Sequence, residues 1–334
     1  MRWNISKKVI LIVIVVLMVA LTGFALAKKR EITIKNSTGT AKIATPTPLS
    51  KGPLAGVDCA NSNARPWAVM MPSDPEARPL AGIGQADMAF EMPVTESGVT
   101  RMMMVFQCNH PKELGSIRSA REDFVPLVFG LDAIYIHWGG EHGVLAELDS
   151  HILDNIDCIK LDGTTCLRKR NIPMPHNGYT TSDLIVNKAK ALGYKLSDNS
   201  VSYPHTGDWR PATGAPVNPP ALFNDANRVT WTYHADTNTY TRARAGAPEI
   251  DRATGTQVAA SNIAVLHTTS QYVSMLYNRV KTIGSGTMTM YQNGIVIPGT
   301  WQKETKKSKL KLLDTSGKEI PLVPGSTWFE IVTE

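Results

Sequence analysis

An uncharged run of nineteen residues near the start of the chain, residues 9–27, limits the possible folds more than any other feature. As a helix this run would extend about 28 Å, which is close to the hydrocarbon thickness of a bilayer. It therefore predicts a membrane-spanning anchor or a signal peptide and not part of a globular core. Its length exceeds that of the usual signal-peptide core and favours a retained transmembrane helix, although "ALA" at 25–27 fits a cleavage site.

The rest of the chain is expected on the extracytoplasmic side of a single-pass cell-membrane protein. A basic leader before the apolar run and cysteines after it favour a cytoplasmic N terminus and an exported body. Residues 1–30 then form the anchor or signal segment. Residues 31–52 are rich in Thr, Ser, Pro and Lys, which predicts a flexible linker. The membrane, contacted through the N-terminal helix, is thus one predicted partner.

The distribution of charge argues against a nucleic-acid partner, although the formal net charge is +6. Six of the 35 basic residues flank the apolar run, and beyond Glu31 the remaining 29 basic and 28 acidic residues leave a net charge of +1. Local basic clusters remain at 168–170 and 303–311, where solvated turns are the simpler interpretation. The exported body is nearly neutral, so its overall field does not favour a polyanion.

The four cysteines favour two disulfides in an oxidising compartment. We expect Cys158–Cys166, which closes a short loop, and Cys59–Cys108, because each of the latter adjoins a predicted strand; the other two pairings remain open. The spacing contains no CxxC, and the histidines form no HExxH pair, so no metal site is expected. No phosphate-binding or dinucleotide-binding fingerprint is present, so no cofactor is expected.

Beyond the linker, the pattern predicts an α/β-type N-terminal domain, residues 53–204, and a β-rich C-terminal domain, residues 224–334. Apolar runs at 65–71, 86–92, 100–107 and 133–138 predict buried strands, and helix-like stretches at 120–131, 143–153 and 181–193 predict helices around a mixed sheet. A Pro-rich connection, residues 205–223, separates the two parts. In the second part, Asn293–Gly294 between two apolar runs predicts a β-hairpin.

Several motifs occur in a fixed order along the chain: "RPWAVMM", "GSIRSARED", "DAIYIHWGG", "PHNGYTT" and the C-terminal stretch from "GTMTMYQNG" to "STWFEIV". This ordered set resembles the YerB-like family of bacterial envelope lipoproteins, a two-part domain of unknown function. The resemblance covers most of residues 53–334 and implies an exported, membrane-tethered protein without supplying an activity. Two features depart from the pattern: no cysteine for lipid attachment follows the apolar run, and Glu141 replaces an expected small polar residue.

Two arginines at a predicted helix start suggest an anion site. Ser119 and Glu122 fit a capping box, which predicts that a helix begins at Ala120. Arg118 and Arg121 would then lie beside free backbone N–H groups at the positive end of the helix, a combination suited to phosphate or carboxylate. The alternative is that neighbouring carboxylates simply pair with the two arginines.

His137 ends a predicted strand and precedes the Gly139–Gly140 turn, at the kind of strand end where ligands bind in parallel sheets. If 100–107 and 133–138 are parallel, Arg118, Arg121 and His137 share one sheet edge. A hydrogen-bonded structural histidine is the alternative to a catalytic one.

Two further sets of polar residues are candidates for ligand binding. Glu91 and Glu96 could form an acid–base pair near Arg101, or could neutralise an arginine; a hairpin between them would place them at the edge opposite His137. His176 and Asn177 lie in a Pro/Gly loop before a helix, where they could contact a ligand or simply form a turn.

These features favour a membrane-anchored extracytoplasmic binding protein that recognises an anionic ligand, with a cell-wall polymer or an envelope protein as candidate partner. One alternative is an envelope hydrolase acting on cell-wall glycan or peptide through His137 or the Glu91/Glu96 pair. Another is a protein-interaction scaffold or extracellular nucleic-acid binder that uses the lysines of 303–311. The sequence favours binding over catalysis, leaves an enzyme open, and does not indicate the oligomeric state.

Overall fold

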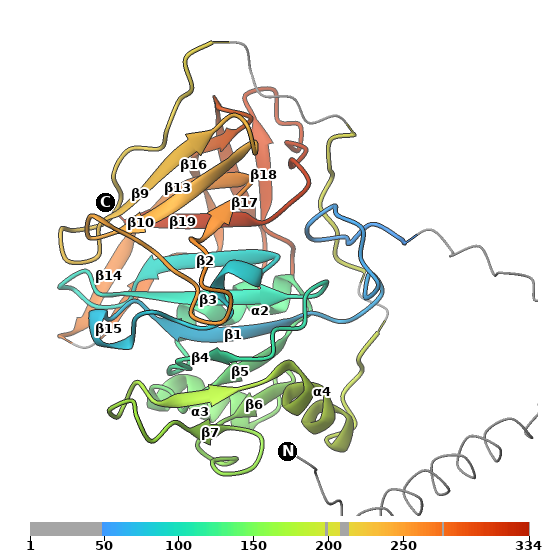
Figure 1. The fold of residues 1–334 in the computed structure, drawn as a ribbon, viewed down its shortest axis with the longest axis vertical. Coiled ribbons are helices and arrows are strands. Elements are labelled where there is room, and N and C mark those ends of the chain that lie inside the picture. The colour runs from blue at the N-terminus through green and yellow to red at the C-terminus, as the bar shows by residue number, and fades with distance from the viewer. Residues whose placement is uncertain (1–48, 198–199, 208–213, 276, 334) are drawn as a thin grey trace, which may run out of the picture. The chain divides into compact units, whose positions relative to one another are not determined.

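Four strands predicted from short apolar runs lie side by side at the centre of one large sheet. A computed structural model of the chain describes residues 49–197, 200–207, 214–275 and 277–333. The ten-stranded sheet runs, in spatial order, through β18 (Lys311–Asp314), β17 (Ile295–Lys303), β16 (Gly284–Gln292), β13 (Asn262–Thr268), β19 (Thr327–Thr333), β2 (Met88–Pro93), β3 (Thr100–Phe106), β1 (Trp67–Pro72), β5 (Ile134–His137) and β6 (Asn155–Asp157) (Figure 1). The sheet contains both parallel and antiparallel pairs, which confirms the predicted mixed sheet.

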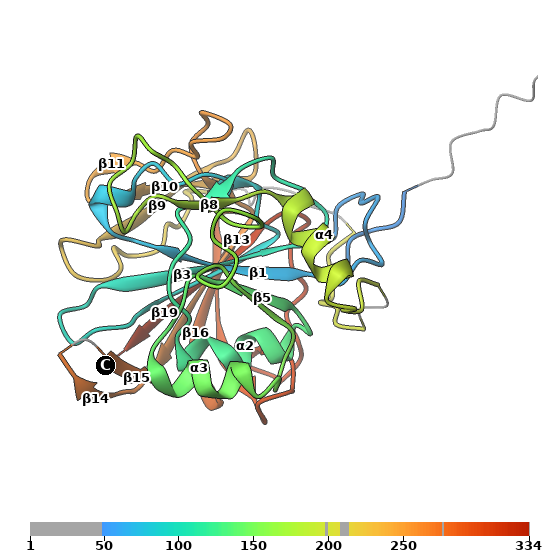
Figure 2. The ribbon, with the colours of Figure 1, turned by 90° about the horizontal axis from the view of Figure 1, so that it is seen from below.

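The central strands are buried on both faces, which explains why they are apolar without alternation. Ala68 and Met70 of β1 point into one core, and Trp67, Val69 and Met71 point into the other. The first core contains residues of α2 (Val125–Gly130) and α3 (His142–Asp149), and the second contains residues of α4 (Ser182–Ala191). The helices therefore cover both faces of the sheet (Figure 2).

Three smaller sheets surround the large one. The first lies over the second core and includes β9 (Val229–His234) and β10 (Thr239–Arg244), with short strands β11 (Ala247–Pro248) and β12 (Ala259–Ala260). The second is the hairpin of β14 (Ser270–Ser274) and β15 (Tyr277–Val280), and the third joins β4 (Leu114–Gly115), β8 (Gly178–Thr180) and β7 (Leu167–Arg168). The β-rich character predicted for the C-terminal part is thus confirmed.

Local sequence signals account for several element boundaries. Asn293 and Gly294 both adopt positive φ angles, 55° and 73°, in the turn between β16 and β17, as a two-residue hairpin loop requires. Thr181 caps α4 by accepting a hydrogen bond from the Leu184 backbone N–H at 3.2 Å. Pro126 lies in the first turn of α2, where its missing N–H does no harm.

Residues 49–334 form one compact unit, and its large sheet joins five adjacent strands of the predicted C-terminal part to five adjacent strands of the predicted N-terminal part. The last strand, β19, lies between β13 and β2 and pairs in parallel with each. Both expected disulfides are confirmed, Cys59–Cys108 and Cys158–Cys166.

The apolar segment predicted at residues 9–27 lies outside the described residues, as does the linker through residue 48. Within the ranges that the structure describes, the helices are too short or too polar to cross a membrane.

Candidate anion-binding site

The candidate site lies at the sheet edge where β1 and β5 end and β3 begins. β1 pairs in parallel with β5 and antiparallel with β3, and the register places Pro72 of β1 opposite Arg101 of β3. Two predictions are therefore wrong: β3 and β5 run in opposite directions, and the β2–β3 hairpin lies on the same edge as His137. Both errors come from β1, which inserts between β3 and β5 and reverses the relation between them.

Arg118 lies on an extended segment between the ends of β1 and β5. Its backbone N–H donates to the Met70 carbonyl at 2.8 Å, and its carbonyl accepts from the Trp138 N–H at 2.9 Å. The Ala120 N–H likewise donates to the Gly139 carbonyl at 2.8 Å. These bonds hold the segment as a strand-like connection and bring Arg118 to the sheet edge.

The helix predicted from Ala120 is wrong. A 3₁₀ turn begins only at Glu122, Arg121 occupies the cap position without a side-chain cap, and α2 follows from Val125. Ser119 does not cap because the backbone on either side is bonded to the neighbouring strand ends. The free helix N-terminus proposed to attract an anion is consequently not part of the site, whose positive charge comes from side chains.

Asp74 forms ion pairs with both Arg101 and Arg118, and the sequence analysis did not identify it. Its Oδ2 lies 3.1 Å from Arg101 Nη1 and 3.4 Å from Arg118 Nη2, so one carboxylate oxygen serves two guanidinium groups. Burial alone would raise the pKa of Asp74, but Arg101 and Arg118 outweigh it and lower that pKa below its ordinary value. The available signal was its position: Ser73–Asp74 directly follows the first predicted strand.

The protein leaves part of the hydrogen-bonding capacity of this cluster unfilled. The Nε atoms of Arg101, Arg118 and Arg121 and the Nδ1 atom of His176 are buried without a hydrogen-bond partner in the described chain. Burial lowers the pKa of Arg101 to about 10, with Asp74 opposing the decrease and Arg118 and Arg121 adding to it. We call Arg101, Arg118, Arg121 and His176 the arginine cluster.

His176 belongs to this cluster through its charge environment. Burial lowers its pKa, the nearby Arg118 lowers it further, and Asp74 partly opposes both effects. An additional anion beside Arg118 would oppose the same decrease. His176 is therefore the member of the cluster whose charge responds to a bound anion.

Arg121 partly fits the alternative interpretation, in which a neighbouring carboxylate pairs with the arginine. Its Nη1 lies 3.7 Å from Glu141 Oε2, and its guanidinium stacks on the Tyr277 ring at 4.7 Å. Glu141 is shared with Arg279, whose Nη1 lies 3.1 Å from it, and Arg279 also contacts Glu122 at 2.9 Å. The Glu141 carboxylate is therefore divided between two arginines and does not neutralise Arg121 alone.

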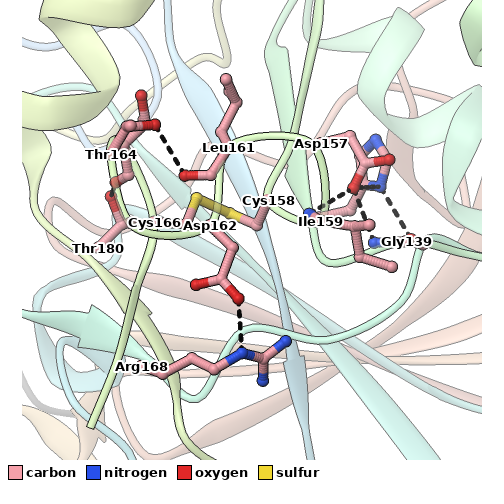
Figure 3. Close-up of a disulfide and its surroundings, with 12 residues drawn as sticks. Gly139, Asp157, Cys158, Ile159, Leu161, Asp162, Thr164, Cys166, Arg168 and Thr180 are labelled. Carbon is pink, nitrogen blue, oxygen red and sulfur yellow. Dashed lines mark hydrogen bonds and ion pairs between the residues drawn. A yellow bond between two sulfur atoms is a disulfide. The ribbon is translucent and has the colours of Figure 1, made fainter.

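His137 is a structural residue and not a member of the cluster. It is fully buried, with Nδ1 at 2.8 Å from the Gly139 carbonyl and Nε2 at 3.2 Å from Asn155 Oδ1. Asp157 accepts hydrogen bonds from the Gly139 and Ile159 N–H groups, both at 2.9 Å, beside the Cys158–Cys166 disulfide (Figure 3). These contacts fix the turn after β5 and leave the imidazole without a route to solvent.

Glu91 and Glu96 are not brought together as an acid–base pair. Glu91 is fully buried and bonded to Arg242, Arg244 and Thr100, whereas Glu96 is exposed in the β2–β3 turn. Burial would raise the pKa of Glu91, but Arg244 and Arg242 outweigh it and lower that pKa. Glu91 thus neutralises arginines, which was the alternative interpretation of this residue.

Asn177 lies next to His176 in the chain but serves the loop. Its Oδ1 accepts from Arg168 Nη1 at 3.0 Å, and Arg168 stacks on the Trp138 ring at 4.4 Å. Arg168 Nε also pairs with Asp162 at 2.6 Å, within the segment closed by the disulfide (Figure 3). These contacts position the loop that carries His176.

The arrangement of the cluster suits a tetrahedral or planar oxyanion. Guanidinium groups donate in a fixed fork that matches phosphate, sulfate and carboxylate oxygens, and partial burial strengthens each interaction. The side chains of Arg101, Arg118 and Arg121 keep exposed fractions of 10%, 14% and 13%, so the cluster borders solvent. Of the eight residues predicted to bind a ligand, the structure brings together these three and His176.

Two models of one family match the chain. The "Protein of unknown function (DUF3048) N-terminal domain" matches residues 54–195, and the corresponding C-terminal domain matches residues 220–329. The first range contains the whole arginine cluster.

The comparisons also identify a similar protein of Bacillus subtilis (strain 168), described as "Putative lipoprotein YerB". It is 33% identical over 292 residues, which cover 85% of this chain and 86% of that protein. The crystal structure of YerB protein from Bacillus subtilis matches with a TM-score of 0.75 at 30% identity, over 85% of this chain and 97% of that one. The resemblance inferred from the ordered motifs is confirmed, and the chain belongs to the DUF3048 family.

Proposed function

We propose that this protein binds an anionic ligand of the cell envelope through Arg101, Arg118, Arg121 and His176. The observation that carries the proposal is that the guanidinium groups of Arg101 and Arg118 share one carboxylate oxygen of Asp74, that Arg121 shares Glu141 with Arg279, and that all three cluster side chains border solvent. A bound oxyanion would accept charge-assisted hydrogen bonds from these guanidinium groups, each worth about 1.5–3 kcal/mol.

The proposed location is the extracytoplasmic face of the cell membrane. Two disulfides favour an oxidising compartment, and the similar protein YerB is described as a lipoprotein. In this chain the proposed tether is the apolar segment at residues 9–27.

Cell-wall polymers are the proposed ligand class, because their phosphate and carboxylate groups match guanidinium donors. Hydrolysis is not proposed, since His137 and Glu91 are both fully buried and bonded within the protein. A nucleic-acid ligand is not proposed either, since the exported body carries a net charge near +1.

The test is a calorimetric titration of residues 49–334 with a phosphodiester-bearing wall polymer and with a neutral glycan. This part suffices because it forms one compact unit. The match to the YerB crystal structure also covers 85% of this chain and 97% of the crystallised chain. We expect the R118Q/R121Q variant to bind the polymer at least about tenfold more weakly, since each lost charge-assisted hydrogen bond contributes about 1.5–3 kcal/mol.

The matched control, R228Q/K318Q, removes the same charge from positions outside the arginine cluster, and Arg228 pairs only locally with Asp225. It should retain the affinity of the unmodified protein. Equal polymer affinity for R118Q/R121Q and the control, with both proteins folded, would reject the anion site.

A further inference from the structure

The β14–β15 hairpin carries an exposed apolar tip. Tyr272, Val273 and Met275 are exposed by 55%, 49% and 78% respectively, and they are consecutive but for one residue. Their two strands pair with each other in a sheet of their own (Figure 1). Scattered single apolar residues on a surface need no explanation, but a cluster at a hairpin tip indicates a contact surface.

This tip adjoins the arginine cluster. Tyr277, which pairs with Ser274 across the hairpin, places its ring 4.7 Å from the Arg121 guanidinium. Met275 lies in the hairpin turn, two positions before Tyr277 in the chain. Arg279, on the same strand, pairs with Glu122 and Glu141, and the Asn278 N–H donates to Val94 at 3.0 Å. The hairpin is thus anchored to the elements that form the site.

We infer that the arginine cluster also recognises the phosphate of a membrane lipid, with the hairpin tip contacting the apolar part of the bilayer. An aromatic ring, an aliphatic side chain and a flexible methionine suit the membrane interface. Guanidinium groups beside them complement the phosphate charge. This inference rests on the proposed anion site and adds that the phosphate is presented at a membrane surface.

The length of the chain outside the described residues permits this contact. Residues 28–48, twenty-one in number, separate the predicted apolar segment from Leu49 and can span at most about 75 Å. The 286 residues of the compact unit have an expected radius of gyration of about 19 Å, or roughly 50 Å across. A tether of that reach allows any face of the unit to meet the membrane that holds the anchor.

The test is co-sedimentation of residues 49–334 with phosphatidylglycerol-containing phosphatidylcholine vesicles and with phosphatidylcholine vesicles alone. We expect binding to the anionic vesicles only. The V273S/M275S variant and the R118Q/R121Q variant should each weaken that binding at least fivefold. The control I295S/V296S removes two other exposed apolar residues, 39% and 43% exposed, from β17 and should bind like the unmodified protein.

Three results would overturn the inference: no vesicle binding, equal binding to both vesicle types, or full binding by V273S/M275S. The soluble wall polymer separates the two claims. If R118Q/R121Q loses polymer affinity while V273S/M275S binds vesicles normally, only the lipid inference fails. If R118Q/R121Q binds both polymer and vesicles normally, the anion site and the lipid inference are both rejected.

Discussion

At the residue scale, burial decides which of two similar carboxylates is structural. Glu91 and Glu96 are five positions apart and equally plausible from sequence, yet Glu91 is fully buried between Arg242 and Arg244. Removing one partner of a buried ion pair leaves uncompensated charge and costs about 3–5 kcal/mol. We expect E91Q to lower the free energy of unfolding by that amount, and E96Q, at an exposed turn, to change it by less than about 0.5 kcal/mol. Urea unfolding measures both, and equal effects would contradict the assignment.

His176 makes the affinity for an anion depend on pH. Burial and the nearby Arg118 lower its pKa below the ordinary value of 6.5, and a bound anion would raise that pKa again. Binding therefore takes up a proton, so the affinity should rise as the pH falls through the range below 6.5. A single added charge contributes about 1 kcal/mol near solvent, or roughly a fivefold gain in affinity.

Sulfate is the suitable probe for this effect, because its own charge is constant over the range. Asp74 does not confuse the measurement, since its pKa is lowered and it stays ionised there. Calorimetry at pH values above and below 6.5 should show tighter binding at the lower pH, and H176Q should remove the difference. A flat profile for the unmodified protein would exclude His176 from the site.

At the element scale, strands could be predicted from the sequence and strand order could not. Each of β1, β2, β3 and β5 is a short apolar run bounded by turn residues, because each is buried on both faces. Their neighbours depend on pairing across long stretches of chain, which no local pattern records. The position of β1 between β3 and β5 depends on such long-range pairing. Because of it, Arg101 lies at the same sheet edge as Arg118.

The candidate site shows the same limit. Arg118 and Arg121 could be selected from sequence because two cations close together at a predicted helix start need a reason. The predicted reason, a capped helix from Ala120, was wrong, since the segment extends along the strand ends instead. Asp74 carried no distinctive pattern of its own. Its role follows only from the register that aligns the end of β1 with the start of β3.

At the scale of the whole molecule, the large sheet makes the N-terminal part depend on the C-terminal part. β2 pairs with β19, the last strand of the chain, and Glu91 of β2 pairs with arginines of β10. A fragment of residues 49–204 would expose both the edge of β2 and a buried carboxylate. We expect this fragment not to unfold cooperatively by itself, and to regain near-ultraviolet circular dichroism when residues 214–334 are added. Cooperative unfolding of the fragment alone would contradict this dependence.

An anion bound at the arginine cluster would compete with Asp74 for Arg101 and Arg118, so the D74N variant tests the proposed anion site most directly. Asp74 Oδ2 contacts both Arg101 and Arg118, so removing its charge without changing its size frees both guanidinium groups. We expect D74N to bind sulfate about tenfold more tightly than the unmodified protein, which corresponds to about 1.4 kcal/mol. The exposed control D225N should show no change. If calorimetry finds that folded D74N binds sulfate no more tightly than the unmodified protein, Asp74 simply pairs the arginines and the cluster is structural.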